Sequence, residues 1–167
     1  MNSRMNVKNI RVDKLTEKNI PAFKFYFEKY SHEQDESCPP LDDFTINVND
    51  PVYLLVEDGK ITGAAALMLH PEYREAGLAR MRMFHTVYGD YISYNKLLNS
   101  ILLHTNGLTS IYAFIEDNYS NIAKIWEELG FEARRYAWIL KRSAGNNTMY
   151  EFPEGYELKT FRYGIDE

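Results

Sequence analysis

The stretch VYLLVEDGKITGAAALMLH, residues 52–70, constrains the fold of this chain more than any other. Two apolar runs flank Asp58-Gly59, and an Asp-Gly pair between apolar runs is a strong signal for a tight hairpin turn. Both runs are apolar almost throughout, which is typical of strands that are covered on both faces. We therefore expect a sheet with a layer packed on each side.

Further strands are expected around this hairpin. Residues 10–15, IRVDKL, alternate between apolar and polar types, as half-buried strands do. Residues 78–88, LARMRMFHTVY, also alternate, and a strand there would place Ala79, Met81 and Met83 on one side. Two more strands are predicted over residues 110–117 and 132–142.

Three helices are predicted between these strands. The first is capped by Thr16, the second is capped by Ser93 and closes at Gly107, and the third is capped by Asn118 or Ser120. The third ends at Gly130, a residue suited to the left-handed position after a helix. The order is β-α-β-β-β-α-β-α-β. The expected fold class is α/β, in the broad sense that includes α+β folds, with helices packed on a mixed sheet.

Composition narrows the classes of function. The length of 167 residues predicts one domain, and the net charge of −5 without a basic block argues against duplex nucleic acid as a partner. No apolar run approaches the roughly 20 residues that span a bilayer. One cysteine and four scattered histidines show no metal-ligand spacing. We expect a cytoplasmic protein without a membrane segment, and no metal site.

An acidic stretch, SHEQDESCPPLDDF at residues 31–44, interrupts the regular pattern. It carries five acidic residues and no lysine or arginine. It is either a solvated loop or an acidic rim that attracts a cationic substrate.

The element order, together with NYSNIAKIWEELGFEARRYAWILKR at residues 118–142, resembles the GNAT superfamily of acyl-CoA-dependent N-acetyltransferases. The resemblance spans about residues 8–142 and is most specific over residues 111–132. It implies a GNAT-like domain over residues 1–142. Residues 143–167 would be a linker and a final strand, either of the chain's own sheet or of a second GNAT-like half.

The resemblance also implies a function. It predicts a central splayed sheet and transfer of an acetyl group from acetyl-CoA to a primary amine of a small molecule or polyamine-like acceptor. The alternative is a catalytically degenerate GNAT-fold domain, either a CoA-binding regulatory half or a dimerisation module. A homodimer is therefore one assembly that the sequence leaves open.

In this family a glycine-rich loop at a helix start holds the diphosphate of the co-substrate on backbone N–H groups. REAGLA, residues 74–79, matches that motif by letter but directly follows the hairpin. GDYISY, residues 89–94, lies between strand and helix but keeps only Gly89, because Ile92 and Tyr94 occupy the expected glycine positions. The second stretch is preferred on position. The residues that would line acetyl-CoA are then Phe84, Thr86, Val87, Gly89, Asp90, Tyr91, Ile92, Ser93, Tyr94, Asn118 and Asn121.

The family's reaction also needs a base, an oxyanion donor and often a tyrosine acid. His85 and Glu116 are the candidates for the base, and backbone N–H groups between Phe84 and Thr86 for the oxyanion donor. Trp126 stands where the tyrosine is usual, and an indole cannot act as that acid. Tyr119 and Tyr136 are the nearby tyrosines, and Tyr119 is the candidate for the acid. A buried hydrogen-bonded role for His85, a surface role for Glu116 and a packing role for Trp126 are the alternatives.

Overall fold

The structure is a computed structural model that describes residues 10–33, 50–116, 118–136, 153–156, 159–160 and 162–163. The chain divides into two compact units, Met1–Glu132 and Ala133–Glu167. Every helix and strand of the described residues lies in the first unit. The predicted boundary at residue 142 lies outside the described residues.

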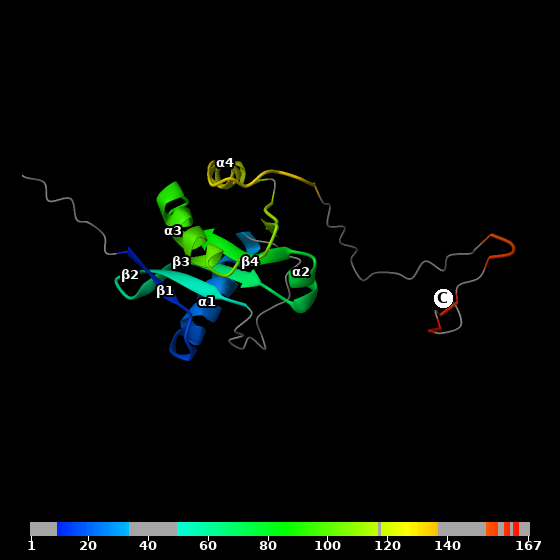
Figure 1. Ribbon diagram of the computed structural model, residues 1–167, viewed down its shortest axis with the longest axis horizontal. Coiled ribbons are helices and arrows are strands. Elements are labelled where there is room, and N and C mark those ends of the chain that lie inside the picture. The colour runs from blue at the N-terminus through cyan, green and yellow to red at the C-terminus, as the bar shows by residue number, and fades with distance from the viewer. Residues whose placement is uncertain are drawn as a thin grey trace, which may run out of the picture. The chain divides into compact units, whose positions relative to one another are not determined.

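The first unit is built on a five-stranded sheet in the order β1-β2-β3-β4-β5 (Figure 1). Neighbouring strands from β1 to β4 run antiparallel, and β5 runs parallel to β4, so the sheet is mixed as predicted. The strands are β1 (Ile10–Lys14), β2 (Val52–Glu57), β3 (Lys60–Met68), β4 (Leu78–Thr86) and β5 (Ser110–Tyr112).

The predicted hairpin joins β2 to β3. Asp58 and Gly59 have φ values of 49° and 78°, which is the pair of positive angles that a tight two-residue hairpin turn requires. The consecutive buried residues on both strands confirm that this hairpin is covered on both faces.

Helices cover both faces of the sheet (Figure 1). Helix α1 (Ile20–Tyr30) packs on one face through Phe23, Tyr26 and Phe27. On the other face lie α3 (Tyr91–Leu102) and α4 (Ser120–Glu128), which bury their apolar stripes against the sheet. A short helix, α2 (Pro71–Glu75), precedes β4, and two 3-10 turns, η1 (Glu17–Asn19) and η2 (Ser31–Glu33), flank α1.

The helix ends differ from the prediction in detail. Helix α3 starts two residues before Ser93, because Asp90 caps it, and it ends at Leu102 rather than continuing to Gly107. Thr16 precedes η1 and makes no side-chain cap bond. Helix α4 starts at Ser120 with Tyr119 as its cap residue, so neither Asn118 nor Ser120 caps it as predicted.

A β-bulge in β4 corrects the predicted alternation of this strand. Met83 pairs with Ala66 and Met81 pairs with Leu67, so Arg82 is an extra residue without a partner position on β3. The extra residue shifts the side-chain alternation by one. Met81 therefore packs in the core beneath α3 and α4, whereas Met83 packs in the core beneath α1, and the two do not share a face.

Two predicted strands are shorter than expected or unseen. The strand predicted over residues 110–117 ends at Tyr112, after which residues 113–116 have no regular structure. Of the strand predicted over 132–142, residues 132–136 are exposed and non-regular, and 137–142 lie outside the described residues. A strand needs a neighbour for its backbone groups, and no described segment pairs with the free edge of β5.

The second unit shows one local feature. Residues 153–156 form a turn in which the Tyr156 N–H donates to the Pro153 carbonyl over 3.0 Å, with Gly155 at φ 90°. The described residues among 153–163 contain no strand, so the predicted final strand is absent from that part of the segment.

Candidate active site

Strands β4 and β5 are splayed, as the sequence predicts. They pair only at Leu78–Ser110, Ala79–Ile111 and Arg80–Tyr112. From Met81 to Thr86 the edge of β4 that faces away from β3 has no β5 partner. This opening begins beside the bulge at Arg82. A bulge bends its strand, which is consistent with β4 turning away from β5 at this point.

The backbone at the end of β4 points a donor into the opening. The Val87 N–H donates to the Thr62 carbonyl on the β3 side over 2.9 Å. Because successive N–H groups of a strand point to opposite edges, the Thr86 N–H points to the open side. Thr86 is one of the residues predicted to supply the oxyanion donor.

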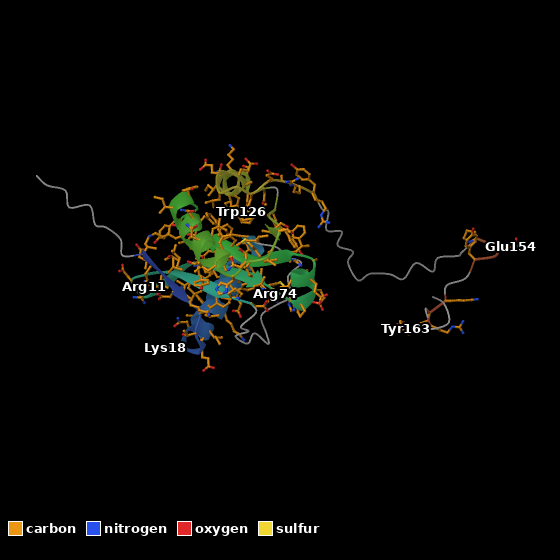
Figure 2. The ribbon with its side chains drawn as sticks, in the orientation of Figure 1. Arg11, Lys18, Arg74, Trp126, Glu154 and Tyr163 are labelled. Carbon is orange, nitrogen blue, oxygen red and sulfur yellow. The ribbon has the colours of Figure 1, made fainter. Side chains whose placement is uncertain are left out.

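Four aromatic side chains pack beneath this open edge. The Phe84 ring lies 4.9 Å from Tyr94, 5.3 Å from Trp126 and 6.0 Å from Phe131, measured between ring centroids. Trp126 lies on the side of α4 that faces the sheet (Figure 2). The packing role that the sequence allowed for Trp126 is therefore real, since the side chain is 5% exposed.

Two polar atoms of this aromatic cluster lack partners. The Tyr94 hydroxyl and the Trp126 indole N–H are buried, and neither has a hydrogen-bond partner in the described part of the chain. Burial raises the pKa of Tyr94 to about 12, while the Thr86 N–H and the Trp126 indole lie close enough to lower that pKa slightly. Both approaches fall short of a well-formed hydrogen bond.

The loop between β4 and α3 is GDYISY, the stretch that was preferred on position. Gly89 has φ 55°, and its N–H closes a turn onto the Thr86 carbonyl over 3.2 Å. Residues 74–79 instead form the end of α2, a turn and the start of β4. The structure therefore leaves GDYISY as the stretch at a helix start next to the splay.

The start of α3 is already occupied in part by an acidic side chain. Asp90 accepts from the Ser93 N–H over 2.8 Å and from the Ser93 hydroxyl over 3.0 Å. It uses one of the N–H groups that a helix leaves unpaired in its first turn and places a carboxylate at the positive end of the helix dipole. Nearby, Val87, Tyr91 and Ile92 expose apolar surface, and Ile92 is 68% exposed.

His85 lies on the opposite face of β4, toward α1, and is 2% exposed. The Tyr26 hydroxyl lies 2.7 Å from Nδ1, the Glu33 carboxylate lies 3.2 Å from Nε2, and the Tyr30 ring stacks on the imidazole at 4.6 Å. Burial lowers the pKa of His85, and Glu33 opposes that shift. Burial also raises the pKa of Tyr26, so Tyr26 donates its proton to Nδ1 and Nε2–H donates to Glu33.

The negative charge of Glu33 affects the pKa values of two tyrosines in this region. It contributes to the raised pKa values of Tyr94 and Tyr119, although burial is the larger cause in both. Glu116 adds to the shift of Tyr119, whose N–H donates to the Glu116 carbonyl over 3.1 Å. The catalytic roles of His85, Glu116 and Tyr119 remain predictions.

Comparison with solved structures identifies the fold. The chain matches an aminoglycoside acetyltransferase from an uncultured soil metagenomic sample, with 16% identity, a TM-score of 0.56 and coverage of 79% of this chain and 97% of that one. It matches a Trypanosoma brucei acetyltransferase with 14% identity, a TM-score of 0.58 and coverage of 80% and 100%. A GCN5-related N-acetyltransferase from Kribbella flavida matches with 14% identity, a TM-score of 0.56 and coverage of 72% and 80%. No protein-family model and no curated protein sequence matches the chain.

The chain has the GNAT fold. The predicted fold class is thereby confirmed, including the splay between the fourth and fifth strands. Within this GNAT fold the residues predicted to line acetyl-CoA fall into two groups: Phe84 to Tyr94 follow the open edge and the helix start, and Asn118 and Asn121 lie exposed at the start of α4. Neither asparagine caps α4, because its cap residue is Tyr119.

The sequence analysis missed two residues of this GNAT-fold site. Tyr26 and Glu33 hold His85 from positions 59 and 52 residues away along the chain. Tyr26 was hidden in the apolar stripe of α1, and Glu33 in the acidic stretch. Among the described residues, no three His, Cys, Asp or Glu side chains are grouped to hold a metal ion, and no helix is long and apolar enough to cross a membrane.

Proposed function

We propose that this chain is an N-acetyltransferase that moves an acetyl group from acetyl-CoA to a primary amine of a small-molecule or polyamine-like acceptor. The observation that carries the proposal is the splay of β4 from β5, which directs the Thr86 N–H toward the open edge and leaves it outside the sheet ladder. The GNAT fold and the buried His85 group beside that edge support it.

The site fits the thioester end of acetyl-CoA better than the diphosphate end. The open edge offers unpaired donors, which a thioester carbonyl can accept from. At the start of α3 the N–H groups of Tyr91 and Ile92 would hold the diphosphate, but the Asp90 carboxylate repels it. When bound, acetyl-CoA supplies the activated acetyl group.

The chain's own residues would prepare the amine. Tyr26, His85 and Glu33 form a row of hydroxyl, imidazole and carboxylate, which is the arrangement that moves a proton in hydrolytic triads. His85 is neutral at neutral pH because burial lowers its pKa, so its Nδ1 can take the proton of Tyr26 as Tyr26 takes one from the ammonium. The Glu33 side chain, 24% exposed, stabilises the imidazolium and attracts the ammonium.

Tyr119 would serve at the other end of the reaction. Its hydroxyl is protonated at neutral pH, as phenols are, so it can donate a proton to the leaving thiolate. Glu116 lies next to Tyr119, whose N–H donates to the Glu116 carbonyl, and the Glu116 carboxylate remains the alternative candidate for the base.

Calorimetry and a thiol-release assay test the proposal. We expect acetyl-CoA to bind, and at least one amine in a panel of mono-, di- and polyamines to accelerate thiol release. The matched control is Tyr53→Phe, which alters a hydroxyl bonded to His104 and should leave both measurements unchanged. Absence of acetyl-CoA binding would remove the proposed function.

A specific observation favours a second function. Asp90 and the exposed apolar side chain of Ile92 occupy the helix start that should hold diphosphate. A GNAT-fold domain without chemistry, serving as a CoA-binding regulatory half or a dimerisation module, would retain the fold and tolerate both residues. Binding of CoA without thiol release for any amine would favour this function.

A further inference from the structure

The open edge of β4 holds an excess of buried hydrogen-bond donors. The Thr86 N–H, the Tyr94 hydroxyl and the Trp126 indole N–H come from β4, α3 and α4, and the Thr86 N–H and the Trp126 indole both lower the pKa of the Tyr94 hydroxyl. The Tyr94 oxygen is the acceptor that these donors share, and it forms no well-aligned bond with either neighbour. The Tyr94 side chain is 0% exposed and the Trp126 side chain 5%.

Such unmet donors are uncommon in folded proteins. Most buried polar side-chain atoms have a hydrogen-bond partner, because a buried group without one loses its hydrogen bonds to water and gains none in return. Here two such donors, the Tyr94 hydroxyl and the Trp126 indole N–H, lie on contacting side chains beside the Thr86 N–H, which has no β5 partner. One acceptor placed between them could serve these donors together. A single carbonyl oxygen, which has two lone pairs, would satisfy two of these three donors, and the Tyr94 oxygen can accept from the third.

We propose that Tyr94 and Trp126, together with the Thr86 N–H, form a binding site for the carbonyl oxygen of an acyl thioester. The inference rests on the proposed function and assigns to Trp126 the job of a hydrogen-bond donor. An indole N–H cannot release its proton to a thiolate, but it can donate a hydrogen bond to an oxygen that gains negative charge during amine attack. The aromatic rings of Phe84 and Phe131 surround the donors and exclude water, which strengthens those bonds.

The substrate end that this site recognises is the acyl carbonyl. CoA with a free thiol has no oxygen to offer there, whereas acetyl-CoA does. The site therefore favours the acylated co-substrate over the free thiol product by up to two side-chain hydrogen bonds. This preference would help to offset the weak hold on diphosphate at a helix start that carries Asp90.

The indole N–H resonance of Trp126 reports on the proposed bond directly. The chain has two tryptophans, and Trp138→Phe assigns their indole signals in a ¹⁵N-labelled protein. We expect acetyl-CoA to move the Trp126 indole proton downfield, and CoA with a free thiol to leave it near its unliganded position. This measurement needs no amine acceptor, so it is independent of turnover.

Two conservative variants test the donors separately. Tyr94→Phe and Trp126→Phe each remove one donor while keeping an aromatic ring, and each should lower the affinity for acetyl-CoA relative to CoA by about 2- to 10-fold. In thiol release, the same variants should lower kcat more than they raise KM, because charge on the oxygen grows toward the transition state. Tyr53→Phe is the matched control and should change neither ratio.

The outcomes separate the two proposals. If neither acetyl-CoA nor CoA binds in calorimetry, the proposed function and the carbonyl site both fail. If both bind equally and the Trp126 signal responds to them alike, the carbonyl site is overturned while acetyl transfer stands. A preference for acetyl-CoA that survives in both Phe variants also overturns it.

Discussion

Tyr94→Phe should make the protein more stable. In the unliganded chain the hydroxyl is fully buried without a well-formed partner. Leaving such a group unmet costs about 1–3 kcal/mol, and the loose approach of two neighbouring N–H groups recovers part of that. Phenylalanine keeps the contacts of the ring with Phe84 and Trp126. We therefore expect the free energy of unfolding to rise by about 1 kcal/mol.

The assay is unfolding followed by circular dichroism, in urea and by heating. For a chain of this length, about 1 kcal/mol corresponds to a rise in Tm of about 2–4 °C. Tyr53→Phe is the control, because its hydroxyl lies 2.9 Å from His104 Nε2 and its loss should lower stability by about 0.5–1.5 kcal/mol. If Tyr94→Phe loses as much stability as Tyr53→Phe, the Tyr94 hydroxyl has a partner after all and the carbonyl site loses its physical basis.

Three further predictions concern the helix start and the His85 group. Asp90→Asn keeps the cap bond and removes a negative charge, so the affinity for acetyl-CoA should rise about 2- to 5-fold in calorimetry. Ile92→Glu adds a charge at the same place, so affinity should fall, and an unchanged affinity would mean that this helix start does not hold diphosphate. Glu33 raises the pKa of His85, so Glu33→Gln should move the acidic limb of the thiol-release rate to lower pH, and an unmoved limb would exclude His85 as the base.

The pKa of His85 also sets a stability change. Because burial lowers this pKa in the folded state, the folded protein binds a proton less readily than the unfolded chain does, whose histidine titrates near 6.5. The contribution of His85 to stability is then complete above that pH and declines as the pH falls toward the folded-state pKa.

The order of elements could be predicted because its signals are local. Asp58 and Gly59 determine a turn by their own backbone preferences, and the stripes of α1 and α3 follow the helical period. The cap at Asp90 is equally local, since Asp90 and Ser93 stand three residues apart at the helix start. A comparison of GDYISY with a glycine-rich phosphate loop does not reveal the cap at Asp90, because that pattern concerns only the glycine positions.

The bulge and the His85 group depend on distant partners. Arg82 is extra only in relation to the register of β3, although the adjacent apolar pair Met83-Phe84 interrupts the alternation and is a local hint. No spacing in the sequence brings Tyr26 and Glu33 to His85, because the fold of α1 over β4 does so. The splay was predictable only from the resemblance, since it is the absence of pairing over part of two strands.

Two positions at which the chain departs from the family pattern lie in contact. The resemblance implies a glycine at the position of Tyr94 and a tyrosine at that of Trp126, and the two rings lie 6.4 Å apart at the centroids. Two side chains that each lost an unrelated function would have no reason to lie in contact. Two side chains that donate to one acceptor must lie close together. Side chains that act on a common group give non-additive changes when both are altered.

The combined variant Tyr94→Phe/Trp126→Phe tests that coupling. Without ligand, the two stability changes should not add, because the Trp126 indole N–H approaches the Tyr94 oxygen and the two side chains are in contact. In the affinity for acetyl-CoA relative to CoA, the double variant should lose less than the product of the single losses, since a carbonyl deprived of one donor is held less well by the other. Multiplicative losses in binding would instead describe two independent packing positions.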